Sequence, residues 1–183
     1  MDGSEDATVL VVDDERHLAD LYAEYLEEYE TLTAYGGAEA LDRLSPAIDV
    51  VVLDRRMPDQ SGNEVLAAIG ERDLGCRVAL VTGTSPDFDV IGLGVDDYLV
   101  KPVTRDELRE TVDRLCLLDA YTRSVRDLTT KKVQRNVLAV EKPRSELEDS
   151  DWFQSLQKDI DDLEATVERI AEELDLENES LRL

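Results

Sequence analysis

The chain has 183 residues, with 44 acidic and 20 basic side chains, and its net charge is −24 at pH 7. A core of about 120 residues can fold alone, so this length predicts one ordinary domain with an appendage, and a hydrophobic content of 42% excludes a disordered chain. The carboxylates are spread along the sequence, which indicates adaptation to high salt in a halophilic source and disfavours a protein that coats nucleic acid or anionic membranes.

The first segment, residues 1–6, is acidic where a secretory signal peptide would be basic, so we expect a disordered N-terminus and no export. No apolar run approaches the roughly 18 residues that cross a bilayer, so no membrane association is expected. Cys76 and Cys116 do not form the pattern of a disulfide framework. These features predict a cytoplasmic, reduced protein.

Apolar runs and amphipathic stretches alternate over the first hundred residues. Continuous apolar runs at 8–12, 50–53 and 78–81 predict strands buried on both faces, as in a parallel sheet covered by helices. Weaker strands are predicted at 31–34 and 98–100. Helices are predicted from apolar spacing over 18–29 and 39–44, and from capping boxes that begin at Ser61 and Thr104. The pattern predicts an α/β fold with a five-stranded parallel sheet and five helices.

Chemically selective residues follow the predicted strands. Asp13 and Asp14 follow the first strand, Asp54 the third, Thr82 the fourth and Lys101 the fifth. All parallel strands end at one edge of the sheet, where ligands bind. Converging carboxylates stay ionised most readily around a divalent cation, and an oxygen-only site with an open face suits Mg²⁺. A carboxylate beside a metal and an ammonium group is a good phosphoryl acceptor.

These residues, together with Met57-Pro58, Gly62 and the run from Asp96 to Pro102, resemble the receiver domain of two-component response regulators over residues 7–118. The resemblance implies a flavodoxin-like fold, a sensor histidine kinase as phosphodonor and a signalling protein that is no enzyme beyond its own phosphorylation and dephosphorylation. It also implies the following roles: Asp54 as phosphoacceptor, Asp13, Asp14, Asp54 and the backbone carbonyl of Arg56 around Mg²⁺, Lys101 on the phosphoryl group across a cis peptide to Pro102, and Thr82 with Tyr98 as a switch pair.

Other interpretations stay open for these residues. Asp13 and Asp14 could cap the first helix, Thr82 could be a turn residue, and Tyr98 could be an ordinary strand aromatic. A receiver-like scaffold that accepts no phosphate and acts through its tail is the alternative function, and a metal-dependent hydrolase is a third. The stretch from Thr82 to Gly94 is shorter than is usual for the family, which implies a short fourth helix.

The remaining chain, residues 119–183, predicts two helices. Neither glycine nor proline interrupts residues 103–142, Pro143 marks a break, and residues 145–150 are predicted to form a polar turn. Apolar residues from Phe153 to Leu174 then follow heptad spacing, which predicts a helical hairpin or a dimeric coiled coil. This segment resembles the HalX-type regulators of halophilic archaea, and we expect output by contact with a protein partner or by self-association.

One short segment, residues 123–144, carries a net charge of +5. Its basic side chains could contact DNA phosphates, with transcriptional control as the consequence, or they could offset the acidic second helix across a hairpin. The hairpin interpretation is favoured, because salt weakens DNA contacts steeply and no DNA-binding motif is visible. The residues concerned are Arg123, Arg126, Lys131, Lys132 and Arg135.

Overall fold

The computed structural model describes residues 7–58, 60–83 and 94–180, and the side chains up to residue 174. The chain divides into two compact units, Met1–Asp119 and Ala120–Leu183, which are described here one after the other. The predicted disorder of residues 1–6 and the predicted short fourth helix fall outside the described residues.

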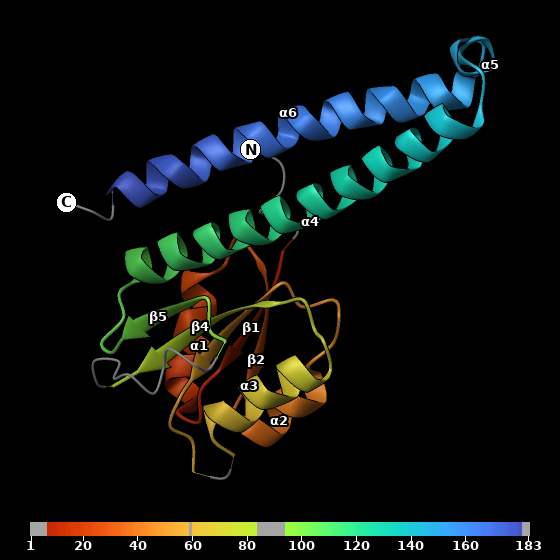
Figure 1. Ribbon diagram of the computed structural model, residues 1–183. Helices are drawn as coiled ribbons and strands as arrows, with labels where there is room; N and C mark the ends of the chain where they lie inside the picture. The colour runs from red at the N-terminus through yellow and green to blue at the C-terminus, as the bar shows by residue number, and fades with distance from the viewer. Residues whose placement is uncertain (1–6, 59, 84–93, 181–183) are drawn as a thin grey trace. The chain divides into compact units, whose positions relative to one another are not determined.

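The first unit contains a five-stranded parallel sheet in the order β2-β1-β3-β4-β5 (Figure 1). Its strands are β1 (Thr8–Val12), β2 (Glu30–Ala34), β3 (Val50–Asp54), β4 (Arg77–Thr82) and β5 (Asp97–Val100). Helices α1 (Arg16–Tyr25), α2 (Gly37–Arg43) and α3 (Gly62–Glu71) alternate with them, and α4 (Arg105–Glu141) begins in this unit. The predicted α/β fold with its parallel sheet is therefore confirmed.

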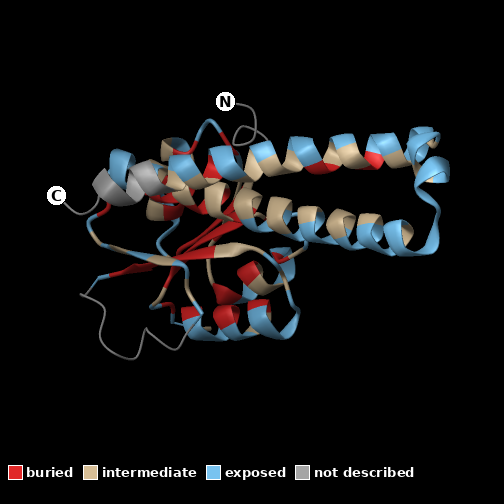
Figure 2. Cartoon of the chain, turned by 45° about the horizontal axis from the view of Figure 1, so that its top comes forward, coloured by how far each residue is buried: buried red, intermediate tan, exposed pale blue. Residues whose placement is uncertain are grey.

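Alternate residues of the central strands build two apolar cores. Val9, Val11, Val50 and Val52 pack with α1 and with the first turns of α4, including Leu108. The intervening residues pack with α2 and α3 on the opposite face, and Figure 2 shows the buried residues of the strands and helices in red. All five residues of β3 are buried, which explains its uninterrupted apolar sequence.

The predicted first helix is shorter than its apolar spacing suggests. It ends at Tyr25, although Leu26 and Tyr29 continue the spacing and are both buried. Tyr29 enters the core from the loop, and its hydroxyl group donates a hydrogen bond to Asp113 on α4. The apolar pattern up to Tyr29 therefore indicates which residues are buried, whereas the helix ends about one turn before the pattern does.

The amino ends of two strands are fixed by carboxylates. Asp49 accepts a hydrogen bond from the backbone N–H of Thr8 at 2.8 Å, and Asp96 accepts one from Val78 at 2.8 Å. Asp96 also forms an ion pair with Arg77 at 2.9 Å. These bonds give partners to backbone N–H groups at the edge of the sheet opposite the acidic residues Asp13 and Asp54.

The second unit is an antiparallel helical hairpin. Beyond Asp119, α4 continues to Glu141, a short helix α5 (Arg144–Glu148) follows, and α6 runs over Asp151–Ser180. The two long helices lie side by side in Figures 1 and 2, and Lys131 pairs with Asp159 and Lys132 with Glu164, at 2.7 and 2.6 Å. The hairpin prediction is confirmed.

The connection between the two long helices differs from its prediction. Residues 145–150 were expected to form a polar turn, but α5 occupies most of them. Pro143 caps this helix, and i,i+4 ion pairs from Lys142 to Glu146 and from Arg144 to Glu148 support one short helical turn. No helix within the described residues is long and apolar enough to cross a membrane.

Candidate functional site

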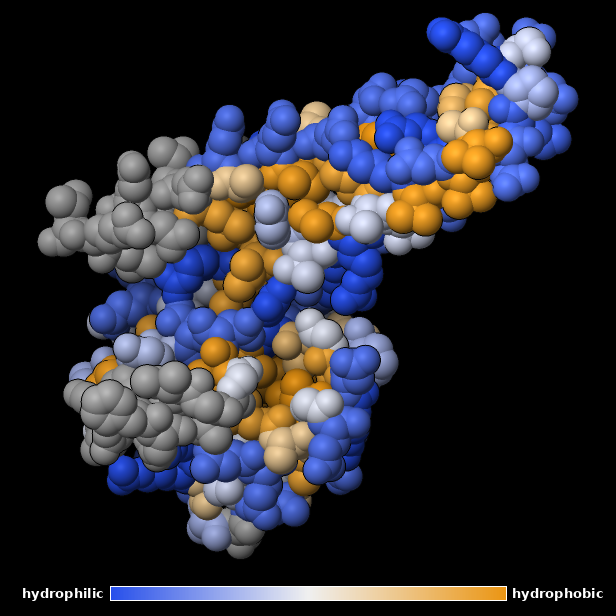
Figure 3. Space-filling model, viewed as in Figure 1, coloured by the Kyte–Doolittle hydropathy of each residue, from blue (hydrophilic) through white to orange (hydrophobic). Residues whose placement is uncertain are grey.

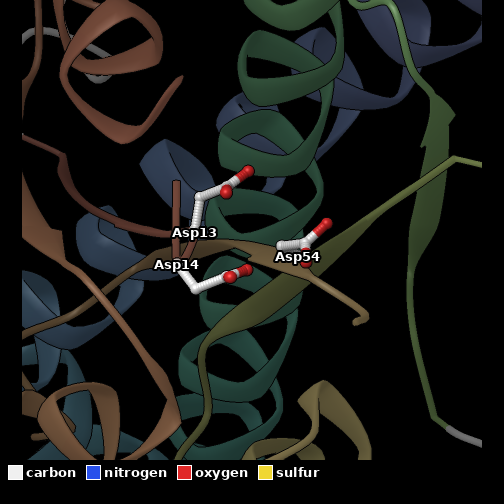
Figure 4. Close-up of side chains that lie close together, drawn as sticks. All are labelled: Asp13, Asp14 and Asp54. Carbon is white, nitrogen blue, oxygen red and sulfur yellow. The ribbon is translucent and has the colours of Figure 1, made fainter. Parts of the chain in front are cut away.

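Three carboxylates meet at the carboxyl edge of the sheet. Asp13 and Asp14 directly follow β1, and Asp54 is the last residue of the adjacent strand β3. Oxygen atoms of all three side chains lie within 4.8 Å of one another, and Figure 4 shows the side chains directed toward a common space. Asp13 and Asp54 are buried, whereas Asp14 is half-buried. The cluster is therefore open to solvent on the side of Asp14.

Lys101 joins two of these carboxylates. Its Nζ atom lies 2.8 Å from Oδ2 of Asp13 and 2.9 Å from Oδ1 of Asp54. Lys101 follows β5, and the peptide bond to Pro102 is cis, as the resemblance to receiver domains implies. Its backbone N–H donates to the carbonyl oxygen of Thr82, at 2.8 Å, which ties the end of β5 to the end of β4.

Backbone N–H groups hold the remaining carboxylate oxygens. Glu15 donates to Oδ1 of Asp13 at 2.9 Å, and Arg56 donates to Oδ2 of Asp54 at 3.0 Å. Each buried carboxylate is therefore held by one lysine bond and one backbone bond. These bonds fix the orientation of both carboxylates at the ends of buried strands.

Burial and neighbouring charges act in opposite directions on this site. Burial raises the pKa of Asp54, an effect that the hydrogen bond and charge of Lys101 oppose and the charge of Asp13 reinforces. Burial lowers the pKa of Lys101, but its hydrogen bonds to Asp13 and Asp54 outweigh this, and the pKa rises overall. Lys101 therefore stays charged throughout the physiological range and balances one of the two buried negative charges.

Gly62 brings α3 unusually close to the end of β3. A Cβ atom at this position would lie 2.6 Å from the carbonyl oxygen of Asp54 and 3.0 Å from the Cα atom of Arg55. The Gly62 N–H donates to the carbonyl oxygen of Arg55 at 3.1 Å, and the Ser61 and Glu64 side chains form the predicted capping box. The sequence singles out this glycine only through the family pattern, because its close contact is with the backbone of Asp54 and Arg55, at the end of the preceding strand and outside the helix.

The two predicted switch residues lie in different environments. Thr82 is the last residue of β4 and is buried, at 1% exposure. Tyr98 lies on the edge strand β5 and is 48% exposed. The structure therefore brings Thr82 to the same edge as the acidic cluster, while the Tyr98 ring faces solvent.

The basic residues of the tail belong to the hairpin unit. Lys131 and Lys132 have acidic partners on α6, and Arg135 donates to the side chain of Asn136 at 3.3 Å. Arg126 is exposed on α4, and Arg123 has interaction partners of its own.

The donor set of the acidic cluster fits Mg²⁺. It offers carboxylate oxygens only, in a group with an open side, and a hard divalent cation of this size combines few carboxylates with water and phosphate oxygens. The carboxylates gather beside a lysine at the end of buried strands, which differs from the scattered acidic surface of the rest of the chain.

Comparisons with known proteins agree with this architecture. The family model of the response regulator receiver domain matches residues 9–113, and that of the HalX domain matches residues 117–182. A protein of Haloferax volcanii named "Putative transcriptional regulator" is 49% identical over 121 residues, which is 65% of this chain and 21% of that protein. Its source is a halophilic archaeon, in agreement with the acidic composition.

Bacterial proteins match the first unit. Response regulator SaeR of Staphylococcus epidermidis is 37% identical over 106 residues, which is 55% of this chain and 46% of SaeR. The crystal structure of response regulator protein TrrA from Thermotoga maritima, in complex with Mg²⁺ and BeF, has a TM-score of 0.54 and 37% identity, and the match covers 60% of this chain and 98% of TrrA. The chain thus spans about a fifth of the length of the Haloferax volcanii protein and about half of the length of SaeR.

The receiver model covers more than half of the chain, and the five-stranded parallel sheet agrees with the receiver structures that match it. The chain therefore belongs to the response regulator receiver domain family, with a HalX domain following the receiver.

Proposed function

We propose that this chain is a two-component response regulator whose receiver accepts a phosphoryl group on Asp54 and signals through its C-terminal helices. The proposal is carried by one observation: Lys101 Nζ is bonded to both Asp13 and Asp54, and Asp14 completes a carboxylate cluster within 4.8 Å. A scaffold without phosphotransfer gains nothing from burying this charged arrangement, because buried charges are costly unless they are used or fully compensated.

The chemistry follows from the positions of these groups. An ionised Oδ atom of Asp54 attacks phosphorus, a new O–P bond forms, and the bond from phosphorus to the nitrogen of a phosphohistidine breaks, with the electron pair leaving on that nitrogen. Lys101 lies beside Oδ1 of Asp54, where its ammonium group balances charge on the transferring oxygens. The product is an acyl phosphate on Asp54.

The cation site is assigned to Asp13, Asp14, Asp54 and the backbone carbonyl of Arg56. When bound there, Mg²⁺ supplies further positive charge that neutralises phosphoryl oxygens and orients the donor. The N–H of Arg56 already holds Asp54, so this residue would bind the carboxylate through its N–H and the neighbouring cation through its carbonyl oxygen.

The response to phosphorylation is assigned to Thr82 and Tyr98. A phosphoryl dianion on Asp54 attracts the hydroxyl group of Thr82, which ends the neighbouring strand. Movement of Thr82 affects β5 directly, because its carbonyl accepts from Lys101 at 2.8 Å, and Tyr98 on β5 then turns from solvent into the vacated space.

The phosphodonor is assigned to a sensor histidine kinase and the output to the HalX hairpin in the cytoplasm. Output by protein contact is favoured, since Lys131 and Lys132 are engaged by α6. A role in transcription is suggested by the name of the Haloferax volcanii relative. On this assignment the protein does not turn over a separate substrate. It catalyses only its own phosphorylation and dephosphorylation.

Intact-mass measurement tests the central claim. The full chain is incubated with Mg²⁺ and a small phosphodonor such as acetyl phosphate in molar KCl, beside an Asp54→Asn control. We expect one added phosphoryl group in the wild type and none in the variant. A folded wild-type protein that binds Mg²⁺ without forming an adduct would favour the scaffold alternative instead.

A further inference from the structure

A second heptad seam lies on α4, in addition to the face that carries the α6 contacts. Arg126, Thr130, Val133, Val137 and Val140 follow one another at alternating spacings of four and three residues. All five are exposed, and the three valines are 57%, 57% and 83% exposed. We refer to these five residues as the outer seam. Alternating 4-3 spacing of β-branched residues is typical of a helix that pairs with another helix.

The outer seam is distinct from the inner face of the hairpin. Lys131 and Lys132 form the ion pairs to α6, and Leu128 and Leu138 on α4 are half-buried, whereas the seam residues between them are exposed. In Figure 3 hydrophobic surface follows the outer border of α4 over its C-terminal half. Exposed valines in register are unusual in a chain with so many charged residues, and they mark an interaction surface.

Charge limits what can cover this surface. The chain carries −24 in total, and a second copy is repelled by most of it. Residues 123–144, which contain the whole outer seam, carry +5, and ion pairs to α6 compensate two of those charges. Two copies that pair through the outer seam avoid the acidic excess of the rest of the chain, and molar salt screens the repulsion between their remaining basic side chains.

The residues flanking the seam also fit self-pairing. Thr129, Gln134 and Asn136 are neutral, and the Thr130 hydroxyl donates to the Arg126 carbonyl at 3.0 Å, so it needs no partner from another chain. Apart from Arg126, the outer seam offers uncharged, β-branched residues to its counterpart.

We propose that the outer seam of α4 pairs with the outer seam of a second copy of this chain, in parallel orientation. Antiparallel pairing would place Asp127 beside Glu141 of the second copy, whereas parallel pairing places Thr129 beside Gln134 and Asn136 beside Glu141. The two copies of Arg126 meet at one end, where high salt screens their repulsion. This inference deepens the proposed output through the C-terminal helices, because it assigns one seam to the hairpin and another to the dimer.

Sedimentation equilibrium of the full chain in molar KCl tests the proposal, with and without acetyl phosphate and Mg²⁺. We expect the mass to approach twice the 20.5 kDa of one chain as concentration rises. Val137→Glu should abolish this increase and keep the far-UV circular dichroism of the wild type, because glutamate is a better helix former than valine. Ser155→Glu adds the same charge at an exposed position of α6 and should dimerise like the wild type.

A second measurement addresses the orientation. Val137→Cys, in a chain that also carries Cys76→Ser and Cys116→Ala, should form an interchain disulfide on mild oxidation, and Gln134→Cys in the same background should not. A wild-type mass that stays monomeric in both phosphorylation states overturns the proposal and leaves the seam to a different protein. A dimer that Val137→Glu does not weaken overturns it as well. Intact mass of the same samples reports phosphorylation of Asp54 separately, so failure here is distinguishable from failure of the receiver function.

Discussion

Replacing Gly62 by alanine should destabilise the receiver and distort its acidic site. The added Cβ atom would lie 2.6 Å from the carbonyl oxygen of Asp54 and 3.0 Å from Cα of Arg55, and both are backbone atoms that cannot rotate away. Overpacking of this kind costs about 1–3 kcal/mol, and the helix-propensity gain of alanine over glycine offsets at most about 1 kcal/mol of it. We expect a net loss of about 1–2 kcal/mol in the free energy of unfolding.

Gly70 provides the matched control, because it lies in the same helix and a Cβ atom there meets nothing within 4 Å. Gly70→Ala should raise the free energy of unfolding by about 0.5–1 kcal/mol. Urea denaturation in molar KCl, followed by circular dichroism, measures both variants. The acetyl phosphate reaction of Gly62→Ala should also be slower, since the clash displaces the backbone of Asp54. Equal stabilisation by both substitutions would refute the close-approach argument.

Three further predictions concern the charged and titratable groups. Lys101→Met leaves Asp13 and Asp54 without their shared cation, and it should lower the free energy of unfolding in Mg²⁺-free buffer by about 3 kcal/mol; a loss below 1 kcal/mol in a urea titration would contradict this. Burial raises the pKa of Asp54 in the folded state, so its ionisation costs stability as pH rises from the unfolded pKa through the folded one. Asp54→Asn should therefore be more stable than the wild type at pH 7 without Mg²⁺, the difference should shrink as pH falls below that window, and a constant difference across pH would refute the assignment. Burial raises the pKa of the Cys76 thiol to about 11, so its alkylation by iodoacetamide should accelerate continuously from pH 7 toward pH 11; peptide mass mapping separates it from Cys116, and a plateau near pH 8 would be incompatible with this pKa.

Much of the receiver could be predicted from sequence because its signals are local or tied to the ends of strands. The buried apolar run of β3 and the capping boxes at Ser61 and Thr104 depend on neighbouring residues only, and the structure contains them. The convergence of Asp13 and Asp54 follows from parallel topology, since adjacent parallel strands end at the same edge.

Other features required the three-dimensional arrangement. The apolar spacing through Tyr29 suggested a longer helix, because burial from a loop and burial from a helix leave the same pattern. The bond from Lys101 to Asp13 joins residues 88 positions apart, so no local pattern reveals it. By contrast, the short helix over most of residues 145–150 has a signal in the sequence itself, because Lys142 with Glu146 and Arg144 with Glu148 have the i,i+4 spacing of helical ion pairs.

The carboxylates that hold strand ends bear on any attempt to adapt this protein to low salt. Such redesign would neutralise acidic surface residues, and charge alone makes all 44 acidic residues of the chain look equivalent. Asp49 and Asp96 are different, because each accepts a backbone N–H at the start of a strand, from Thr8 and Val78. Replacing these two by lysine would leave strand amides unpaired, so a low-salt redesign should spare them and change exposed carboxylates of α6 instead.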